Sequence, residues 1–383
     1  MTSTHSPLRA GIIGGGFMAA VHSRAVWASG AVVSAVASSS SERSAEAQRL
    51  TGARDVAQSV DALLERADVD VIHICTPNAT HEEFALRALS AGKRIVCEKP
   101  LATSATAAAT IVEAADGAGI PGTVPFVYRF HPMVREMRAL IASGALGVAS
   151  VVQGSYLQDW LSSASSTNWR VDALTGGRSR AFADIGSHWF DVLEFVTGER
   201  VVRVSAQVLT VFPDREGVAT TTEDAASVQF ALANGVIGSM VVSQVAAGRK
   251  NRLHLEISGS KSSMAFDQEE PGSLWIGETT GTRRIFPDAA RLSADAARFA
   301  FLPAGHSQGY QDAFNAYVSE TYAFFSGDVS STVGLPFLVD GLRAAILCDA
   351  VIDSAASGGQ WLDVGPTPPT FHPLTQQIKG EIQ

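Results

Sequence analysis

The chain has 383 residues, of which 46% are hydrophobic and 17% charged, enough apolar material for two domains with their own cores. Its formal net charge of −9 contains no block of like charges, which argues against a nucleic-acid backbone as partner. No apolar run approaches the roughly 20 residues of a membrane span, and the residues before Gly11 are too few and too polar for a signal peptide.

Strands and helices alternate from about residue 8 to 127. Continuous apolar or β-branched runs predict strands buried on both faces at 8–13, 31–37, 69–75, 93–97 and 121–127. The helical stretches between them, at 17–29, 78–91 and 104–118, each end at a glycine, as helices often do. This alternation predicts a doubly wound parallel sheet, and we assign residues 1–128 to this α/β domain.

The pattern changes after Tyr128. A helix at 131–143, a strand at 148–157 and a serine-rich loop at 161–180 precede a helix at 184–197. Asn234-Gly235 is a hairpin signal in a series of closely spaced strands, expected at 200–212, 223–232, 236–246, 251–258 and 263–267. Residues 279–305 look irregular, two helices follow near 309–326 and 336–357, and the last dozen residues read as a tail. We expect an α+β domain over 129–383 with a large open, mostly antiparallel sheet, whose final helix can pack back on the first domain.

Two further features concern the surroundings of the chain. The apolar alternation of Val241, Ser243 and Val245 predicts an open sheet face that needs covering, so we expect self-association. The three cysteines, Cys75, Cys97 and Cys348, are odd in number and far apart, which predicts reduced thiols in a cytoplasmic protein. No cluster of Cys and His indicates a structural metal.

A glycine turn follows the first predicted strand and opens a helix. It reads Gly14-x-Gly16-x-x-Ala19, with Phe17 and Met18 inside the motif. The first glycine permits a tight turn, and Gly16 lets the backbone approach a pyrophosphate, which the helix N-terminus attracts. This context predicts a dinucleotide site. The alternative is a glycine-rich turn that binds nothing.

The end of the second strand bears on which dinucleotide binds. An NAD enzyme usually carries an acid there for the ribose 2′-hydroxyl, but this chain has Ser38 and Ser39 with Arg43 nearby. Hydroxyls and a guanidinium suit a 2′-phosphate, which favours NADP over NAD, unless the serines merely cap the next helix. On the same sheet edge, the backbone of Thr76-Pro77-Asn78 is expected along the ribose and nicotinamide, although Pro77 and Asn78 also suit a helix start.

Three polar residues carry the expected chemistry. Lys99 follows a predicted strand at the edge where open sheets bind ligands, and Asp184 and His188 lie four apart on one helix. For hydride transfer from an alcohol, His188 suits proton acceptance, Lys99 suits stabilisation of the developing alkoxide, and Asp184 suits a second hydroxyl or orientation of His188. Alternatively, Asp184 only caps the helix, His188 is a core residue, Lys99 pairs with Glu98 at the surface, or Asp184, His188 and Asp191 hold a metal.

These motifs together resemble the Gfo/Idh/MocA family of NAD(P)-dependent oxidoreductases across essentially the whole chain. The residues that carry the resemblance are Gly14-Gly15-Gly16-Phe17-Met18, Thr76-Pro77-Asn78 with His81, Glu98-Lys99-Pro100-Leu101 and Asp184-Ile185-Gly186-Ser187-His188. The resemblance implies a Rossmann domain followed by an open-sheet domain, a catalytic set of Lys99, Asp184 and His188, and a cofactor site that includes His81 and Glu98. It also implies a cyclic sugar or polyol substrate and a homodimer or homotetramer. With the full set present, the chain does not resemble the family's non-catalytic sugar-sensing regulators, although these and redox-assisted glycosidases of this fold remain alternatives.

A finer resemblance concerns the substrate. The segment from Gly154 to Trp160 and then Asn168-Trp169-Arg170 resembles that of the family's sugar 3-dehydrogenases, levoglucosan dehydrogenases among them. The serine-rich strand end instead resembles NADP-using anhydrofructose reductases. Aromatic faces can stack on sugar C–H surfaces while polar groups bind hydroxyls, unless these residues simply pack. The candidate sugar-binding residues, beside the catalytic three, are Tyr128, Arg129, Tyr156, Gln158, Asp159, Trp160, Trp169, Arg170, His306 and Tyr310.

Overall fold

The computed structural model describes residues 7–328 and 332–367, which form two compact units. Unit 1 runs to Pro125 and takes up the chain again at Phe314–Arg343, and unit 2 comprises Phe126–Ala313 and Ala344–Pro366. The chain thus first leaves unit 1 close to the predicted boundary and later returns to it. The predicted C-terminal tail lies outside the described residues.

Unit 1 is built on a six-stranded parallel sheet of order β3-β2-β1-β4-β5-β6. This is the order of the doubly wound dinucleotide-binding fold, and the Rossmann prediction is confirmed. Its strands are β1 (Arg9–Ile13), β2 (Val32–Ala37), β3 (Asp55–Val56), β4 (Val71–Ile74), β5 (Arg94–Cys97) and β6 (Gly122–Thr123). Strand β6 is much shorter than predicted because prolines at 121 and 125 flank it and cannot donate to a ladder.

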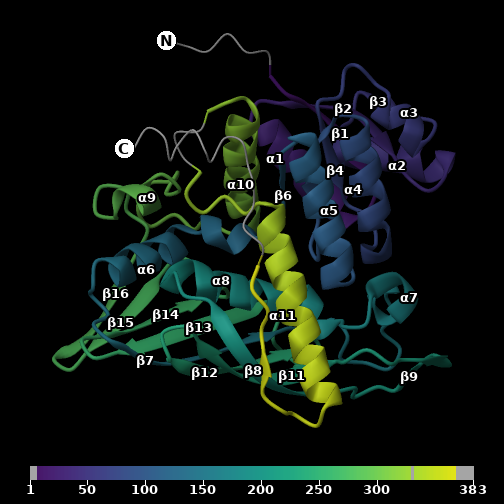
Figure 1. Cartoon of the computed structure of the whole chain (residues 1–383). Coiled ribbons are helices and arrows are strands. Elements are labelled where there is room, and N and C mark those ends of the chain that lie inside the picture. The colour runs from purple at the N-terminus through teal and green to yellow at the C-terminus, as the bar shows by residue number, and fades with distance from the viewer. Residues whose placement is uncertain (1–6, 329–331, 368–383) are drawn as a thin grey trace. The chain divides into compact units, whose positions relative to one another are not determined.

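Helices fill the connections between these strands (Figure 1). They are α1 (Phe17–Ala28), α2 (Ser41–Thr51), α3 (Val60–Leu64), the 3₁₀ turn η1 (Asn78–Thr80), α4 (His81–Ser90) and α5 (Ala105–Ala118). Helix α10 (Tyr310–Phe325), which belongs to unit 1 from Phe314 onward, comes after unit 2 in the chain. The sequence analysis predicted neither β3 nor α3, and it gave no bounds for the helix after the serines, α2. These bounds could not be read from the sequence because α2 buries only Ser44, Ala47 and Thr51 and therefore shows no apolar stripe.

Unit 2 contains a nine-stranded sheet of order β16-β15-β14-β13-β7-β12-β11-β8-β17, in which the β7–β12 pair is parallel. The prediction of a large, mostly antiparallel sheet is confirmed. Its strands are β7 (Ala149–Leu157), β8 (Val201–Leu209), β11 (Ala225–Leu232), β12 (Ile237–Ser243), β13 (Arg252–Gly259), β14 (Ser263–Asp267), β15 (Leu274–Glu278), β16 (Gly281–Ile285) and β17 (Leu362–Asp363). A separate hairpin joins β9 (Asp214–Arg215) to β10 (Val218–Ala219).

Two local predictions for this sheet need correction. Residues 279–305 are not wholly irregular, since they include β16 and the short helix α9 (Ala294–Ala297). Strand β16 was missed because four of its five residues are exposed and show no apolar alternation. Ser243, predicted on the open face with Val241, is buried instead. Gly235 adopts the positive φ of 88° that the Asn234-Gly235 hairpin predicted.

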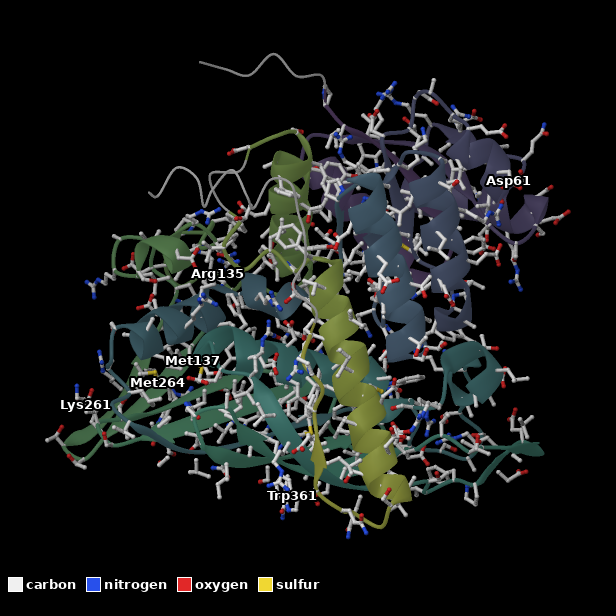
Figure 2. All side chains as sticks on the ribbon, in the orientation of Figure 1. Asp61, Arg135, Met137, Lys261, Met264 and Trp361 are labelled. Atoms are coloured by element: carbon white, nitrogen blue, oxygen red, sulfur yellow. The ribbon has the colours of Figure 1, made fainter. Side chains whose placement is uncertain are left out.

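Helices cover one face of this sheet (Figure 1). Figure 2 labels Met137 of α6 and Met264 of β14, which belong to the large apolar core between helices and sheet. The other face carries exposed apolar residues, including Val151, Ile237 and Val241. The helical segments of unit 2 are η2 (Val127–Phe130), α6 (Pro132–Ala142), η3 (Trp169–Val171), α7 (Ala173–Gly176), the π-helical turn η4 (Phe182–Gly186), α8 (Ser187–Thr197), α9 and, from Ala344, α11 (Leu338–Ala356).

Helix α11 belongs to both units. Its first residues lie in unit 1, where Gly341 packs against Leu101 and Val124 so closely that a Cβ atom would come within 2.8 Å of Leu101. Its later residues Leu347 and Val351 belong to the core of unit 2. None of the helices in the described part of the chain is long and apolar enough to cross a membrane. All three cysteines are free thiols.

Candidate active site

The glycine turn after β1 demands glycine at its first position for two reasons. Gly14 has a φ of 116°, a backbone conformation that residues with a Cβ rarely adopt. A Cβ there would also lie 2.5 Å from the carbonyl oxygen of Cys75. The Gly14 amide donates to the Ala37 carbonyl at 2.8 Å, which ties the turn to the end of β2.

The end of this turn is open in the way a pyrophosphate site requires. Gly16 is the N-cap of α1, no side chain among the described residues accepts from the first amides, and the first turn carries no acidic residue. A Cβ on Gly16 would meet nothing within 4 Å. Phe17 is 72% exposed and Met18 half-buried beside it. Free amides at a helix start, with open space above them, fit the phosphates of a dinucleotide.

The hydroxyls at the end of β2 divide between two roles. Ser40 caps α2 by accepting from the Arg43 amide at 3.2 Å, so the capping alternative is correct for Ser40. The Ser38 amide instead donates to Ser44 Oγ at 2.8 Å, and Ser38 Oγ lies 3.4 Å from the position of a Cβ on Gly15. The Arg43 guanidinium is exposed and donates to Ser39 Oγ at 3.3 Å. The Ser38 hydroxyl therefore lies beside the glycine turn, and the Arg43 guanidinium lies next to Ser39 after the end of β2.

His81 joins the turns that follow β4 and β5. The ring is fully buried, with Nδ1 2.7 Å from the Pro100 carbonyl and Nε2 2.9 Å from the Thr76 carbonyl. Burial lowers the His81 pKa, against the raising effect of these two carbonyls and of Glu98. Pro77 precedes η1, which begins at Asn78, so this segment does start a helix as the alternative proposed.

Glu98 is a buried group rather than one half of a surface ion pair. It is 5% exposed, its Oε1 lies 2.9 Å from His22 Nε2, and its Oε2 accepts from the Lys99 amide at 3.1 Å. Burial opposes ionisation, yet the hydrogen bond from His22 and the charge of Lys99 lower the Glu98 pKa overall. Lys99, half-buried, thus follows a carboxylate at the end of β5.

In unit 2, Asp184 lies in the π-helical turn Phe182–Gly186, which continues into α8. The helical segment therefore begins before residue 184, contrary to the prediction. Glu223 satisfies the N-terminal amides, accepting from Phe182 N at 2.9 Å, Arg180 N at 3.0 Å and Ser179 Oγ at 2.8 Å. Because this buried carboxylate does the capping, the alternative that Asp184 merely caps the helix is wrong. Single π turns are frequent at functional sites.

Two donors hold the Asp184 carboxylate. Gln244 Nε2 donates to Asp184 Oδ2 at 2.7 Å, and Arg170 Nε lies 3.4 Å from Asp184 Oδ1. The Arg170 guanidinium also stacks on Trp169, 4.2 Å from the ring centroid. Gln244 is fully buried, and within the described chain its Oε1 has no hydrogen-bond partner. The sequence analysis missed Gln244, although a lone amide among apolar strand residues was a usable signal.

His188 lies between aromatic rings. It is 6% exposed, and the rings of Tyr128 and Phe126 meet it edge-on at centroid distances of 5.2 and 5.6 Å. These contacts restrict how the imidazole can turn, which suits a group that must exchange a proton in a fixed direction.

A polar chain leads from Tyr128 to the predicted sugar-binding segment. Tyr156 Oη contacts Tyr128 Oη and donates to Asn251 Oδ1 at 2.8 Å, while Asn251 Nδ2 donates to Tyr128 Oη at 3.2 Å. Gln158 Nε2 donates to the same Asn251 oxygen at 2.9 Å, and Trp160 Nε1 donates to Gln158 Oε1 at 2.8 Å. Tyr128 and Tyr156 are buried, so their hydroxyls serve this chain. Asn251, which the sequence analysis did not select, is its hub.

Three other predicted sugar-binding residues are engaged elsewhere. Arg129 is buried and forms an ion pair with Asp191. Asp159 accepts from Lys250 Nζ at 2.7 Å, a hydrogen bond that lowers the Asp159 pKa. His306 is exposed, with Nδ1 3.0 Å from the nearby Pro303 carbonyl. Within the described part of the chain, no group of three or more potential metal ligands comes together.

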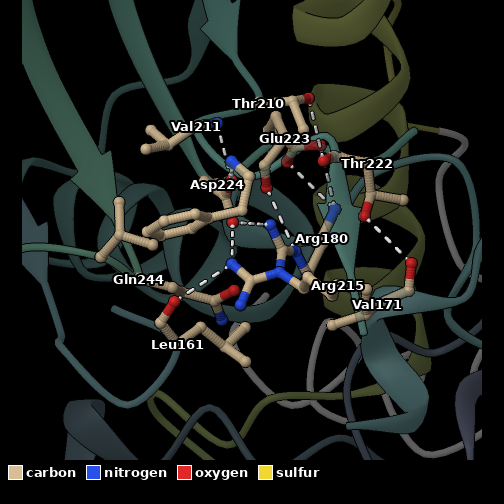
Figure 3. Close-up of polar contacts among 12 residues, drawn as sticks. Leu161, Val171, Arg180, Thr210, Val211, Arg215, Thr222, Glu223, Asp224 and Gln244 are labelled. Atoms are coloured by element: carbon tan, nitrogen blue, oxygen red, sulfur yellow. Dashed lines mark hydrogen bonds and ion pairs between the residues drawn. The ribbon is translucent and has the colours of Figure 1, made fainter. Parts of the chain in front are cut away.

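A buried charge cluster fixes the loop and the strand around Asp184. Figure 3 shows that Arg180 and Arg215 both contact the Asp224 carboxylate, and all three side chains are fully buried. Arg215 also donates to the carbonyls of Leu161, Ser163 and Ser166, at 2.7–3.0 Å. The main-chain amide of Gln244 donates to the main-chain carbonyl of Asp224 at 3.0 Å. The serine-rich loop and the strand end that carries Gln244 therefore share one anchor.

Comparison with known proteins agrees with this geometry. Residues 8–124 match the description "Oxidoreductase family, NAD-binding Rossmann fold", and residues 134–265 match "GFO/IDH/MocA C-terminal domain". Levoglucosan dehydrogenase of Pseudarthrobacter phenanthrenivorans is 30% identical over 93% of this chain and 98% of its own length. Inositol 2-dehydrogenase 2 of Saccharopolyspora erythraea is 29% identical over 95% and 98%.

Among solved structures, a levoglucosan dehydrogenase in complex with NADH and levoglucosan superposes with a TM-score of 0.86. It is 29% identical and the alignment covers 94% of this chain and 100% of that one. The chain therefore belongs to the Gfo/Idh/MocA family of oxidoreductases and carries its NAD-binding Rossmann fold.

Proposed function

We propose that this oxidoreductase transfers a hydride between a nicotinamide and a secondary hydroxyl or keto group of a cyclic sugar, anhydrosugar or inositol. The observation that carries the proposal is the arrangement around Asp184, whose carboxylate is held by Gln244 and Arg170 while Trp169 stacks on that arginine. An oriented carboxylate, a guanidinium and an indole face are a set that suits a polyhydroxylated ring. The relatives named as levoglucosan and inositol dehydrogenases support the substrate class.

Lys99, Asp184 and His188 form the catalytic set of this proposal. The nicotinamide supplies the hydride chemistry when it is bound. His188 accepts the hydroxyl proton during oxidation and returns it during reduction. The Lys99 ammonium stabilises the developing alkoxide, and Asp184, fixed by its two donors, accepts from a second substrate hydroxyl.

For the cofactor, we propose NAD(P) with a preference for NADP. The exposed Arg43 guanidinium and the Ser38 and Ser39 hydroxyls support it, because no acid stands at the end of β2 to hold a ribose 2′-hydroxyl. The complex of the related levoglucosan dehydrogenase with NADH favours NAD instead. The test is to measure the dissociation constants of NADPH and NADH by fluorescence for the wild type and for Arg43→Ala. A loss of affinity in the variant that is confined to NADPH supports the preference for NADP.

The activity is tested by following reduced-nicotinamide absorbance with NAD or NADP and a panel of pyranoses, anhydrosugars and inositols. We expect turnover with at least one compound, and loss of turnover with retained cofactor binding in Lys99→Ala and His188→Ala. Net hydrolysis of a glycoside without net cofactor reduction would identify a redox-assisted glycosidase instead. Sugar binding without any turnover would identify a regulator.

We also propose that the chain forms a homodimer or homotetramer through the open face of the nine-stranded sheet. Val151, Ile237 and Val241 are 43%, 61% and 45% exposed there, more than isolated surface residues require. Light scattering coupled to size exclusion tests this, with Ile237→Lys expected to favour the monomer. The three free thiols support a reducing, cytoplasmic setting.

A further inference from the structure

Four buried polar groups of unit 1 form a continuous hydrogen-bonded chain that the proposed mechanism does not use. Glu98 Oε1 lies 2.9 Å from His22 Nε2, His22 Nδ1 lies 2.7 Å from His73 Nδ1, and His73 Nε2 lies 2.8 Å from Tyr322 Oη. The residues follow or belong to β5, α1, β4 and α10 (Figure 1). Both histidines are fully buried, and Glu98 and Tyr322 are each 5% exposed.

Hydrogen counting distinguishes two arrangements of this chain. Between two facing imidazole nitrogens only one can carry the hydrogen, and a carboxylate only accepts. In the first arrangement the Tyr322 hydroxyl donates to His73 Nε2, His73 Nδ1–H donates to His22 Nδ1, and His22 Nε2–H donates to Glu98. Every donor then has an acceptor, and both rings are neutral.

The second arrangement adds one proton to His22. His22 Nδ1–H would then donate to His73 Nδ1, and His73 Nε2–H would donate to the Tyr322 oxygen. The Tyr322 hydroxyl hydrogen would have no acceptor among the described residues, because its single hydrogen bond there is the one to His73. An unpaired donor in a buried position is costly, so the count favours the first arrangement.

The direction of hydrogen donation along these four residues determines whether the Glu98 charge is offset by His22. Burial lowers the pKa of His73 well below its usual value, which keeps that ring neutral. Burial, together with the charge of Glu98, raises the pKa of the Cys75 and Cys97 thiols, which keeps both uncharged. The other titratable groups whose charge acts on or is acted on by Glu98 are His22, His81, Lys99 and Tyr317. In the second arrangement the positive charge on His22 would offset the negative charge of Glu98. In the first arrangement both imidazole rings are neutral, so the Glu98 charge interacts with the Lys99 ammonium.

We propose that the hydrogen bonds of this buried row are all donated in one direction, from the Tyr322 hydroxyl towards the Glu98 carboxylate. This direction keeps Glu98 as the counter-ion of the Lys99 ammonium. His22, His73 and Tyr322 are then positioning residues, which act through Glu98. The catalytic consequence rests on the proposed role of Lys99, but the direction of the chain does not.

Neutron diffraction from crystals of the full chain, exchanged into D₂O and grown without cofactor near pH 8, tests the direction. We expect deuterium on His73 Nδ1 and not on Nε2, on His22 Nε2 and not on Nδ1, and a Tyr322 O–D vector aimed at His73. Deuterium on both nitrogens of His22, or on His73 Nε2, would overturn the proposal. This measurement needs no substrate, so it decides the direction even if no sugar is turned over.

The consequence for Lys99 is tested by the pH profile of Tyr322→Phe. Removing the hydroxyl leaves His73 Nε2 an unpaired acceptor in the first arrangement, so the first arrangement loses its advantage over the second, which holds one more proton. We expect kcat roughly threefold to fivefold below wild type at pH 6, equivalent to about one hydrogen bond, and unchanged at pH 8.

Tyr317→Phe is the matched control. Tyr317 is also buried on α10, but its hydroxyl contacts Thr123 at 2.7 Å and lies outside the chain. We expect its ratio to wild type to be the same at both pH values. An equal loss at both pH values in Tyr322→Phe, or a pH-dependent loss in Tyr317→Phe, would refute the link to Lys99 while leaving the oxidoreductase activity itself intact.

Discussion

Gln244 donates its side-chain amide to the Asp184 carboxylate at 2.7 Å, across unit 2 from the end of β12 to the π-helical turn. This contact orients the carboxylate that we propose to bind a substrate hydroxyl. Because Gln244 is fully buried, water cannot replace its amide when the side chain is changed.

The first prediction concerns this contact. Gln244→Glu sets two carboxylates against each other, so we expect kcat/KM at pH 8 to fall by about one order of magnitude or more. Activity should partly recover at lower pH, where one carboxyl takes a proton and can donate again. Gln244→Leu should lose activity without that recovery. The control is Gln360→Glu, an exposed residue between α11 and β17, and wild-type kinetics of Gln244→Glu at pH 8 would contradict the assignment.

Asn251 provides a second prediction. Asn251→Ala removes the contacts of its amide with Tyr128, Tyr156 and Gln158. We expect the sugar kcat/KM to drop by about tenfold, the cost of one or two buried hydrogen bonds. Asn251→Asp keeps the accepting oxygen and should lose less. The dissociation constant of NADH should stay the same in both variants, and a matching loss of cofactor binding would contradict the role.

The glycine turn gives a prediction with an internal comparison. Gly14→Ala should destabilise the protein itself, because the position has a φ of 116° and a Cβ would lie 2.5 Å from the Cys75 oxygen. Gly16→Ala should leave thermal unfolding almost unchanged, since a Cβ there meets nothing within 4 Å. It should instead weaken NADH binding by about tenfold or more, because the methyl group occupies the space expected for the pyrophosphate.

A suitable control for these variants is Gly117→Ala. Gly117 lies in α5 with open space around it, so alanine should raise stability by about 0.5–1 kcal/mol without touching cofactor affinity. Unchanged NADH affinity in Gly16→Ala would argue against a pyrophosphate at this turn.

The burial of His131 predicts how the free energy of unfolding depends on pH. It is buried against the Tyr128 ring, its Nε2 has no hydrogen-bond partner in the described chain, and burial lowers its pKa from 6.5 to about 4. The unfolded chain therefore takes up the proton first as pH falls. The His131 contribution to the free energy of unfolding, about 3 kcal/mol in total, should be lost progressively between pH 6.5 and 4.

Urea unfolding at pH 7 and pH 5 measures this effect. His73 and His81 also have lowered pKa values and add acid sensitivity of the same sign, so the comparison must be with His131→Phe. The difference between pH 7 and pH 5 should be smaller in that variant by about 2 kcal/mol. An identical difference in wild type and variant would show that His131 does not contribute.

The fold of unit 1 was largely predictable because its buried strands leave a direct mark on the sequence. The runs at β1, β2, β4 and β5 are apolar throughout, as strands covered on both faces must be. Helix α2 and strand β16 could not be found this way, since both expose most of their residues. The pattern records burial, so elements with little buried apolar surface escape it.

The candidate site divides in the same manner. The glycine turn and the Glu98-Lys99 and Asp184–His188 motifs are local in sequence and could be predicted. Gln244, Asn251 and the His22–His73 contact join residues 60, 93 and 51 positions apart, and sequence spacing carries no information on such pairs. Conversely, Arg129 has the right chemistry for a sugar but is committed to Asp191 by the packing of α8.

The Arg215 side chain donates to the main-chain carbonyl oxygens of Leu161, Ser163 and Ser166 in the serine-rich loop, not to their side chains. Every amino acid supplies a carbonyl, so the identities of these residues are free to drift during evolution while the anchorage persists. Under the proposed function, the loop from Trp160 to Trp169 is therefore a place where substrate choice can diverge, and a target for mutagenic libraries that aim to change the substrate while the Arg215 contacts hold the loop in place.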